Sequence, residues 1–141
     1  MTIHDRGFAE LTTRQFHDIV QLRVDVFVVE QDCPYPELDG RDHEPMTRHI
    51  WTSDDRGVTS YVRVMADPGE TRIGRVVTRE TARGEGLARQ LLDHVLATTD
   101  GPWMLHAQSH LADWYGDAGF VIEGDEFLED DIPHVTMRRS V

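Results

Sequence analysis

RIGRVVTRETARGEGLARQLLDHVLATT, at residues 72–99, is the stretch that decides how this chain folds. It opens with a β-branched run at residues 73–78, which predicts a strand. A turn with two glycines follows, and beyond it apolar residues recur at helical spacing. Those residues are Leu87, Ala88, Leu91, Leu92, Val95 and Leu96. We therefore expect a strand, a tight turn and an amphipathic helix in direct succession.

The turn has the features of an anion-binding site. Its residues are Arg83, Gly84, Glu85, Gly86, Leu87 and Ala88. The first N–H groups of a helix lack acceptors within the helix and lie at the positive end of its dipole. Glycines let the backbone approach a ligand closely, and Arg83 adds a forked cationic donor suited to phosphate. The turn therefore predicts a ligand that carries phosphate.

Two common phosphate loops do not fit this turn. The sequence has no G-x-x-x-x-G-K-[ST] motif, which excludes a P-loop NTPase, and no G-x-G-x-x-G followed by a ribose-binding acid. Taken alone, the turn leaves open an ordinary strand–turn–helix corner whose glycine serves only tight packing.

Upstream of the turn, helix and strand signals alternate. A short apolar strand is expected at residues 8–11, and Thr12 or Thr13 can cap the helix that follows. Residues 14–31 have both helical and strand-like periodicity, and we predict a helix for most of them. Residues 32–45 hold three prolines and many acids, which predict a loop. Strands are expected at residues 48–53 and 58–66, joined by a hairpin turn.

Downstream, Asp-Gly-Pro at residues 100–102 ends the helix of residues 87–99. A buried strand is expected at residues 103–107, and Ser109 can cap a helix over residues 109–117. Strands at residues 120–123 and 134–138 complete the chain. The order β-α-β-β-β-α-β-α-β-β predicts a mixed α/β domain, of the α+β kind, that takes up residues 1–141 as a single unit.

Composition limits the classes of function. The 141 residues are 39% hydrophobic, enough for one core, and no apolar run approaches the roughly 18 residues of a membrane span. The first residues lack the layout of a signal peptide, so we expect a cytoplasmic location and no membrane partner. With 26 acidic against 14 basic residues, the net charge of -12 argues against a nucleic-acid partner. The single cysteine, Cys33, excludes an internal disulfide and is expected to be a bystander.

Acidic residues are concentrated in two runs, residues 30–44 and 123–131. Each run is either solvated surface or part of a mouth that attracts a cationic substrate, and the two interpretations are compatible.

Two motifs together resemble the GCN5-related N-acetyltransferases, the GNAT superfamily. Arg83, Gly86 and Ala88 stand in the defining places of its R-x-x-G-x-G/A turn. Further along, Tyr115 and the Gly119-Phe120 pair match its N-x-x-A-x-x-x-Y-x-x-x-G-F helix. Two motifs in the expected order, on the expected elements, are a much stronger signal than either alone.

Segments outside these motifs look like the ElaA-type subfamily. They are LRVDVFVVEQ at residues 22–31, PYPELDGRD at residues 34–42, His49, and EFLEDDIPHVTM at residues 126–137. The resemblance covers nearly the whole chain. It implies a single GNAT-type domain with a mixed central sheet of about six to seven strands flanked by helices.

The resemblance also implies acetyl-CoA as the donor and direct acetyl transfer to an amine. The turn N–H groups would surround the CoA pyrophosphate, and Arg83 with Arg89 or Arg79 would neutralise its charge. The strand before the turn would pair with the pantetheine arm, and one of its N–H groups would stabilise the oxyanion. Gln108 stands where an Asn commonly contacts pantetheine. The residues expected to bind the donor are Val76, Val77, Thr78, Arg83, Gly84, Glu85, Gly86, Leu87, Ala88, Arg89 and Gln108.

Tyr115 has the residue type and the position to protonate the departing CoA thiolate. Its ordinary pKa near 10 keeps the phenol protonated at neutral pH, as a general acid must be. The structural alternative is a core tyrosine whose hydroxyl bonds a backbone carbonyl.

The general base is not identified by the motifs. Relatives often use a carboxylate on the central strand, but residues 72–79 contain none. An acceptor amine with a pKa near 10 must nonetheless lose a proton before it attacks. Glu30, His49, Glu126 and His134, all in subfamily-specific segments, are the candidates for the base or for contacts with the acceptor.

The remaining signals are weak. His106 and His110, with His43 or His134, suggest a metal site, but the pair falls on different predicted elements, so no metal is expected. The leading hypothesis is an acetyl-CoA-dependent N-acetyltransferase for a small cationic amine or a peptide or protein amine. A non-catalytic acyl-CoA-binding regulatory module and transfer of a longer acyl group stay open, as do a monomer and a homodimer.

Overall fold

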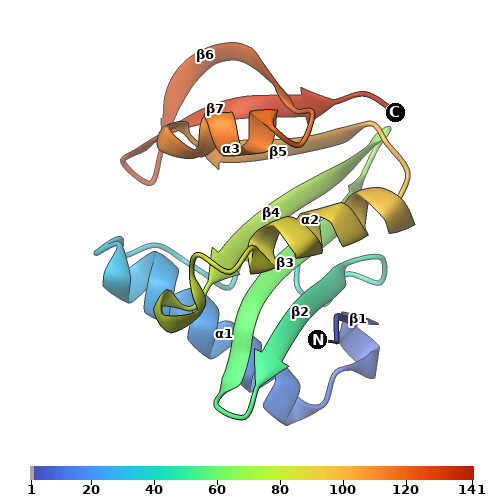
Figure 1. Ribbon diagram of the computed structural model, residues 1–141, viewed down its shortest axis with the longest axis vertical. Coiled ribbons are helices and arrows are strands. Elements are labelled where there is room, and N and C mark those ends of the chain that lie inside the picture. Colours follow the sequence, from blue (N-terminus) through green and yellow to red (C-terminus); the bar gives the residue numbers. More distant parts are fainter. Residues whose placement is uncertain (1) are drawn as a thin grey trace.

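The computed structural model describes residues 2–141, whose seven strands form one mixed sheet in the order β1-β2-β3-β4-β5-β7-β6 (Figure 1). All neighbouring strands are antiparallel except β4 and β5, which are parallel. The strands are β1 (His4–Gly7), β2 (Arg48–Asp54), β3 (Gly57–Asp67), β4 (Glu70–Thr78), β5 (Trp103–Gln108), β6 (Val121–Glu129) and β7 (Ile132–Arg139). The helices are α1 (Thr13–Arg23), α2 (Leu87–Thr98) and α3 (Ala112–Gly116). The predicted fold class is confirmed, and the elements follow the predicted order except that the first strand lies at His4–Gly7 and not at residues 8–11.

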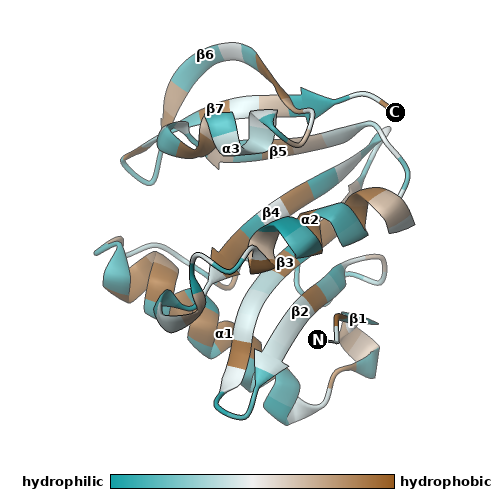
Figure 2. Cartoon of the chain, viewed as in Figure 1, coloured by the Kyte–Doolittle hydropathy of each residue, from teal (hydrophilic) through white to brown (hydrophobic). Residues whose placement is uncertain are grey.

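The sheet is covered on both faces, because α1 and α2 pack on opposite sides of it (Figure 1). Successive residues of a strand point to opposite faces, and Ile50 and Trp51 accordingly belong to two different apolar clusters. The first cluster contains Leu91 of α2, and the second contains Ile19 and Leu22 of α1. Both helices carry hydrophobic and hydrophilic residues, as amphipathic helices do (Figure 2).

The sheet splits between β4 and β5, and this split creates the site. The two strands are paired only at Thr71 with Trp103 and at Arg72 with Met104, and beyond these pairs they diverge (Figure 1). The following residues of β4 therefore have a strand partner on the β3 side alone. β4 also carries a bulge, because Tyr61 lies opposite Val77 whereas Arg63 lies opposite Gly74.

The helix predicted over residues 14–31 is present, although its second half is wound more loosely. Thr12 is the N-cap, and its hydroxyl accepts a hydrogen bond from the N–H of Gln15 at 3.0 Å. After α1 the chain continues as a π-helix over Val24–Glu30. No helix within residues 2–141 has both the length and the apolar character needed to cross a membrane.

Two local predictions are wrong. The strand expected at residues 8–11 is a 3-10 helix, Phe8–Glu10, because the ring of Phe8 packs edge-on against Phe16 and the strand, β1, ends just before it. Ser109 does not cap α3. It begins the 3-10 turn Ser109–Leu111, and its buried hydroxyl has no partner among the described residues.

The strand predicted at residues 120–123 begins one residue later and continues to Glu129 as β6. Its pairing with β7 is irregular between Glu123 and Phe127. The apolar residues of this segment therefore do not alternate regularly, and the sequence pattern did not predict the full length of the strand. The second acidic run therefore belongs largely to an edge strand. At the tip of the β6–β7 hairpin, Asp130 and Asp131 both have positive φ, of 50° and 64°.

Candidate active site

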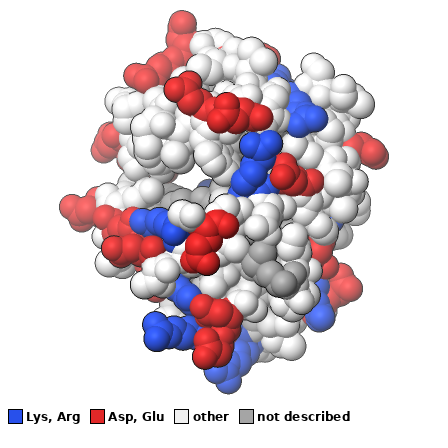
Figure 3. Space-filling view, in the orientation of Figure 1, with Lys and Arg blue, Asp and Glu red and all other residues white. Residues whose placement is uncertain are grey.

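A cavity of about 510 Å³ opens where β4 and β5 diverge. Figure 3 shows the molecule hollowed between the part that carries β5–β7 and the part that carries α1 and α2. Residues of β4, β5, the β6–β7 hairpin and the loop after α1 line it, and Tyr115 of α3 is among them. Another depression, of about 770 Å³, lies beside the C-terminus and contains Arg89 but no other residue predicted for the site.

The glycine turn before α2 presents unpaired backbone donors. Gly84 and Gly86 have φ of +81° and +76°, and no heavy atom lies within 4 Å of a Cβ built on either. The glycines are therefore required by the backbone conformation and not by crowding. The first N–H of α2 with a backbone acceptor is that of Gln90, which bonds the Gly86 carbonyl at 3.1 Å. Within residues 2–141, the N–H groups of residues 84–89 have no protein acceptor, so an anion can take them.

Each arginine predicted to meet phosphate is paired with a carboxylate. Both terminal nitrogens of Arg83 donate to Glu30, at 2.8 and 2.9 Å, and its Nε donates to the Thr78 carbonyl at 3.1 Å. Arg79 is paired with Asp54, and Arg89 with Asp93 at 3.0 Å. The hydrogen bond from Arg83 lowers the pKa of Glu30. The structure thus places Glu30, a candidate base, at the phosphate turn and outside the lining of the cavity.

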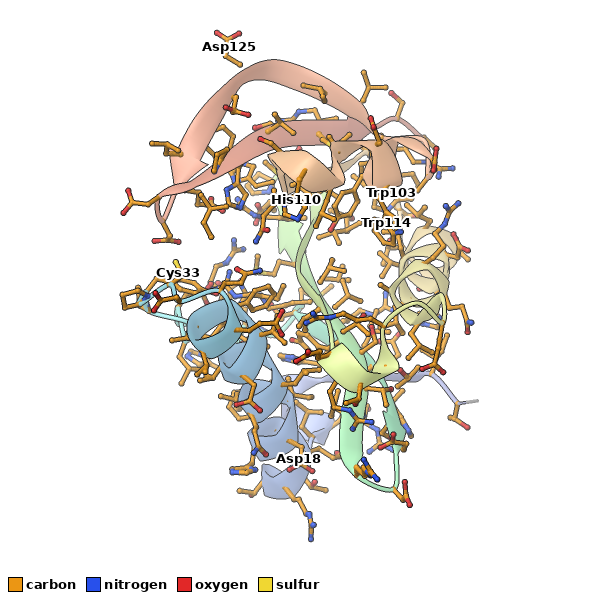
Figure 4. The ribbon with its side chains drawn as sticks, turned by 60° about the vertical axis from the view of Figure 1, so that its left-hand side comes forward. Asp18, Cys33, Trp103, His110, Trp114 and Asp125 are labelled. Atoms are coloured by element: carbon orange, nitrogen blue, oxygen red, sulfur yellow. The ribbon has the colours of Figure 1, made fainter. Side chains whose placement is uncertain are left out.

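Tyr115 is buried, and its ring packs edge-on against Trp114 and Phe120, with centroids 4.8 and 6.2 Å away. Trp114 lies on the same side of α3 as Trp103 (Figure 4). Burial raises the pKa of Tyr115 above its ordinary value, so the phenol stays protonated. Among the described residues its hydroxyl has no hydrogen-bond partner. The alternative of a core tyrosine whose hydroxyl bonds a backbone carbonyl therefore does not fit the structure.

The wall of the cavity formed by β5, β6 and β7 holds two imidazoles and one carboxylate. His106 Nδ1 lies 3.1 Å from Glu129 Oε1, and His134 Nε2 lies 3.5 Å from Glu129 Oε2. The ring of Phe127 contacts both imidazoles, with centroids 5.0 Å from His106 and 6.1 Å from His134. The hydrogen bond from His106 lowers the pKa of Glu129. Among residues 2–141, no group of three His, Cys, Asp or Glu side chains is arranged to hold a metal.

Behind the opposite wall, which Arg63 and Arg75 line, a buried ionic network fastens the loop after the π-helix. Arg23, which is fully buried, donates to Glu37 and to Asp42, both at 2.7 Å. Arg63 donates to Asp42 at 3.1 Å, and Arg75 donates to Glu37 at 2.7 Å. Glu37 and Asp42 are buried and paired with arginines, so they are neither solvated surface nor part of a mouth that attracts a cation. The sequence pattern did not predict a structural role for them, and the signal for that role was the presence of Arg23, Arg63 and Arg75 in neighbouring elements.

Arg75 connects this network to the bulge of β4. Its φ is +52°, in the left-handed region that a residue with a Cβ seldom adopts. Two ion pairs hold it there, to Glu37 at 2.7 Å and to Asp39 at 3.4 Å, and its guanidinium lies 5.6 Å from the centre of the Tyr35 ring. The loop therefore fixes the backbone of β4 at the point where the strand lines the cavity.

The other predicted residues are distributed around this centre. His49 is fully buried away from the cavity, between the Tyr61 hydroxyl at 2.7 Å and the Asp42 carbonyl at 2.9 Å. Glu126 is exposed on β6. Gln108 lines the cavity and donates to Gln31 at 3.2 Å.

Of the predicted pantetheine strand, Val76 lines the cavity and Val77 is buried in the cluster that contains α1. The hydroxyl of Thr78 lies 3.0 Å from that of Ser60.

Cys33 and His110 lie at the margins of this region. Cys33 points toward the end of the β6–β7 hairpin, where its Sγ lies 3.4 Å from the Asp130 carbonyl (Figure 4). His110 lies on the short turn before α3 and does not line the cavity, whereas His106 does (Figure 4). The structure brings His106, Glu129 and His134 together with Tyr115 in one cavity.

Comparisons with known proteins agree with this geometry. A family model described as an acetyltransferase (GNAT) domain matches residues 13–141. A UPF0039 protein of Mycobacterium tuberculosis is 48% identical over 136 residues, which cover 92% of this chain and 87% of that protein. The crystal structure of an acyl-CoA N-acyltransferase from Pseudomonas aeruginosa has a TM-score of 0.93 at 41% identity and covers 99% of both chains. That of Escherichia coli ElaA has a TM-score of 0.94 at 36% identity and covers 99% of this chain and 100% of that one.

Proposed function

Because the chain belongs to the acetyltransferase (GNAT) family, and within it to the ElaA-like proteins, we propose that it transfers an acetyl group from acetyl-CoA directly to a primary amine. The chain is an acyltransferase whose fold binds a CoA thioester and an acceptor. The observation that carries the finer proposal is the cavity at the β4–β5 split, which places Tyr115 beside an unpaired strand edge.

The acetyl-CoA donor binds where backbone groups have no hydrogen-bond partner in the protein. The pyrophosphate takes the free N–H groups of Gly84, Glu85, Gly86, Leu87 and Ala88, and Arg83 turns from Glu30 toward it. The pantetheine arm pairs with the open edge of β4 at Val76, Val77 and Thr78, as an added strand would. Gln108 contacts the arm from the β5 side, and the thioester then enters the cavity.

Proton transfer involves both walls of the cavity. A tetrahedral adduct forms when the amine attacks the thioester carbonyl, and a β4 N–H at the bulge stabilises its oxyanion. As the C–S bond breaks, the Tyr115 hydroxyl gives its proton to the thiolate. Of the four candidate bases, Glu30, His49, Glu126 and His134, only His134 shares the cavity with Tyr115. We therefore assign the base to His134.

The acceptor is a cationic amine, on a small molecule or on a peptide or protein. The net charge of -12 favours approach of a cation, and the carboxylates of Glu129 and Asp130 lie at the cavity.

Release of CoA thiol from acetyl-CoA tests the proposal, with polyamines, aminoglycosides and lysine peptides as acceptors at low and high salt. We expect turnover that favours cationic acceptors and weakens with salt. In Tyr115→Phe, kcat should fall about 10²- to 10⁴-fold while the Kd for CoA is unchanged, because the ring still packs on Trp114 and Phe120. CoA binding without turnover in both proteins would indicate a regulatory CoA-binding module, and faster turnover of a longer acyl-CoA would contradict the acetyl specificity.

A further inference from the structure

When His134 is neutral, the pair that it forms with Glu129 has no hydrogen between its two facing atoms. His134 Nδ1 lies 2.7 Å from the Ile132 carbonyl, and a carbonyl can only accept, so Nδ1 carries the hydrogen. In the neutral imidazole the other nitrogen, Nε2, then presents a lone pair. That lone pair faces Glu129 Oε2 at 3.5 Å, and an ionised carboxylate can also only accept. Two acceptors therefore face each other, and a donor is required between them.

Glu129 is held in this position by its other oxygen. His106 Nδ1 lies 3.1 Å from Oε1, and Nη2 of Arg72 lies 3.4 Å from the same imidazole nitrogen. The hydrogen bond with His106 and the charges of His134, His106 and Arg72 lower the pKa of Glu129, so the carboxylate is ionised. Phe127 packs against both imidazoles. His106, Glu129 and His134 come from three different strands, so the arrangement is set by the sheet and does not depend on one mobile segment.

We propose that Glu129 Oε2 and His134 Nε2 together form the seat of the acceptor's ammonium group. This inference rests on the proposed function and deepens it by naming the chemical class of the acceptor, a primary ammonium, and the residue that selects it. The ammonium has three N–H donors, of which one meets the carboxylate and one meets the imidazole lone pair. A neutral hydroxyl or an anion cannot satisfy both acceptors in this way.

The seat also explains how the amine becomes a nucleophile. One N–H bond of the ammonium breaks and its proton moves to His134 Nε2, so the imidazolium forms beside the ionised Glu129, which stabilises it. The neutral amine then forms the C–N bond with the thioester carbonyl. As the C–S bond breaks, the thiolate takes the Tyr115 proton. The adduct nitrogen returns its surplus proton to the tyrosinate, and His134 releases the first proton to solvent.

The test compares two classes of acceptor in Glu129→Gln. Spermidine or a lysine peptide is a cation at neutral pH, whereas an arylamine is uncharged and needs neither the seat nor a base. We expect the KM for the cation to rise about tenfold while kcat changes little, because the half-exposed carboxylate contributes one charge-assisted hydrogen bond. The kcat/KM for the arylamine and the Kd for acetyl-CoA should not change. His134→Asn should lower kcat for the cation by a larger factor than kcat for the arylamine, because only the cation must lose a proton before it attacks; an equal fall for both would overturn the seat.

Asp125→Asn is the matched control, because it removes one negative charge from the same strand and Asp125 projects away from the molecule (Figure 4). If this control raises the KM for the cation as much as Glu129→Gln does, general charge and not the seat is responsible, and the proposal is overturned. An equal loss for both acceptor classes in Glu129→Gln would indicate a structural role and would overturn it as well. Absence of turnover with every acceptor in the wild type would refute the proposed function, whereas turnover with an unchanged cation KM in Glu129→Gln would refute only the seat.

Discussion

Glu30 accepts hydrogen bonds from both terminal nitrogens of Arg83, at 2.8 and 2.9 Å. The carboxylate lies at the end of the π-helix after α1, and the guanidinium lies at the start of the glycine turn before α2. A carboxylate and a phosphate oxygen present similar geometry to a guanidinium. Under the proposed function, Glu30 occupies the position on Arg83 that a phosphate of CoA would take, so the two would compete.

The first prediction follows from this competition. In Glu30→Gln, Arg83 loses its ionic partner and is free for phosphate, so the Kd for CoA should fall about two- to fivefold, the range expected for an exposed ion pair. Isothermal titration calorimetry with CoA measures it. Glu123→Gln removes an equal charge from an exposed pair with Arg138, away from the turn, and should leave Kd unchanged. Weaker CoA binding in Glu30→Gln would mean that Glu30 orients Arg83 and does not block it.

The second prediction concerns the three tyrosines of the chain, Tyr35, Tyr61 and Tyr115. Burial raises the pKa of each, and the hydrogen bond to Glu37 adds to the effect at Tyr35. Because the folded-state pKa values are raised, the stability they confer is complete below the ordinary pKa of about 10 and is lost as pH rises above it. Near-ultraviolet absorbance should show no tyrosinate below about pH 10, followed by a single rise that coincides with loss of circular dichroism. Tyrosinate formed by the folded protein near pH 10 would contradict this.

The third prediction tests the ionic network beneath the loop. Burial opposes ionisation of Asp42, but the hydrogen bonds and charges of Arg23 and Arg63 together outweigh it and lower the pKa. Asp42→Asn leaves Arg23 and Arg63 each with one anionic partner fewer and should reduce the free energy of unfolding by about 3 kcal/mol. Urea unfolding at neutral pH measures the loss. Asp18→Asn, which breaks an exposed pair on α1, should cost less than about 0.5 kcal/mol.

The pH dependence of stability in the same variant shows whether the charge of Asp42 is responsible for the stabilisation. Because the folded-state pKa of Asp42 is lowered, its contribution is complete above its ordinary pKa of about 4 and is lost as pH falls through the lowered value. The stability difference between the wild type and Asp42→Asn should therefore shrink in acid. A difference that stays constant down to about pH 2 would show that packing, and not charge, is responsible.

The fourth prediction concerns the tip of the β6–β7 hairpin. Asp130 and Asp131 both have positive φ, as the two central residues of a type I′ turn do, and glycine is favoured at the second of these positions. Asp131→Gly relieves this strain and should raise the free energy of unfolding by about 0.5 kcal/mol. Asp131→Ala, which keeps a Cβ but loses the polar side chain that tolerates this conformation, should lower it by about 1 kcal/mol. Thermal unfolding of the two variants compares them, and equal shifts would exclude backbone strain as the cause.

Local sequence patterns were sufficient for the parts of the protein that neighbouring residues determine. The glycine turn, α2 and the class of fold follow from the order of residues along a short stretch, and Tyr115 was found because it lies at a fixed spacing from Gly119. The short strand β1 was missed, since its residues, His4–Gly7, are mostly polar and their pairing with β2 is a tertiary contact. Ser109 had the residue type of an N-cap but stands inside a 3-10 turn.

The sequence by itself thus determined a strand, a glycine turn and a helix, and with Tyr115 it indicated the family. Only the tertiary structure decided which side chains come together around the cavity. His134 and Glu129 approach each other across a hairpin, His106 reaches them from β5, and Arg83 meets Glu30 from a distant part of the chain. The physical reason is that a local pattern follows from the backbone conformation of consecutive residues. A site assembled from several strands depends instead on pairing register and on the β4–β5 split, which no single segment encodes.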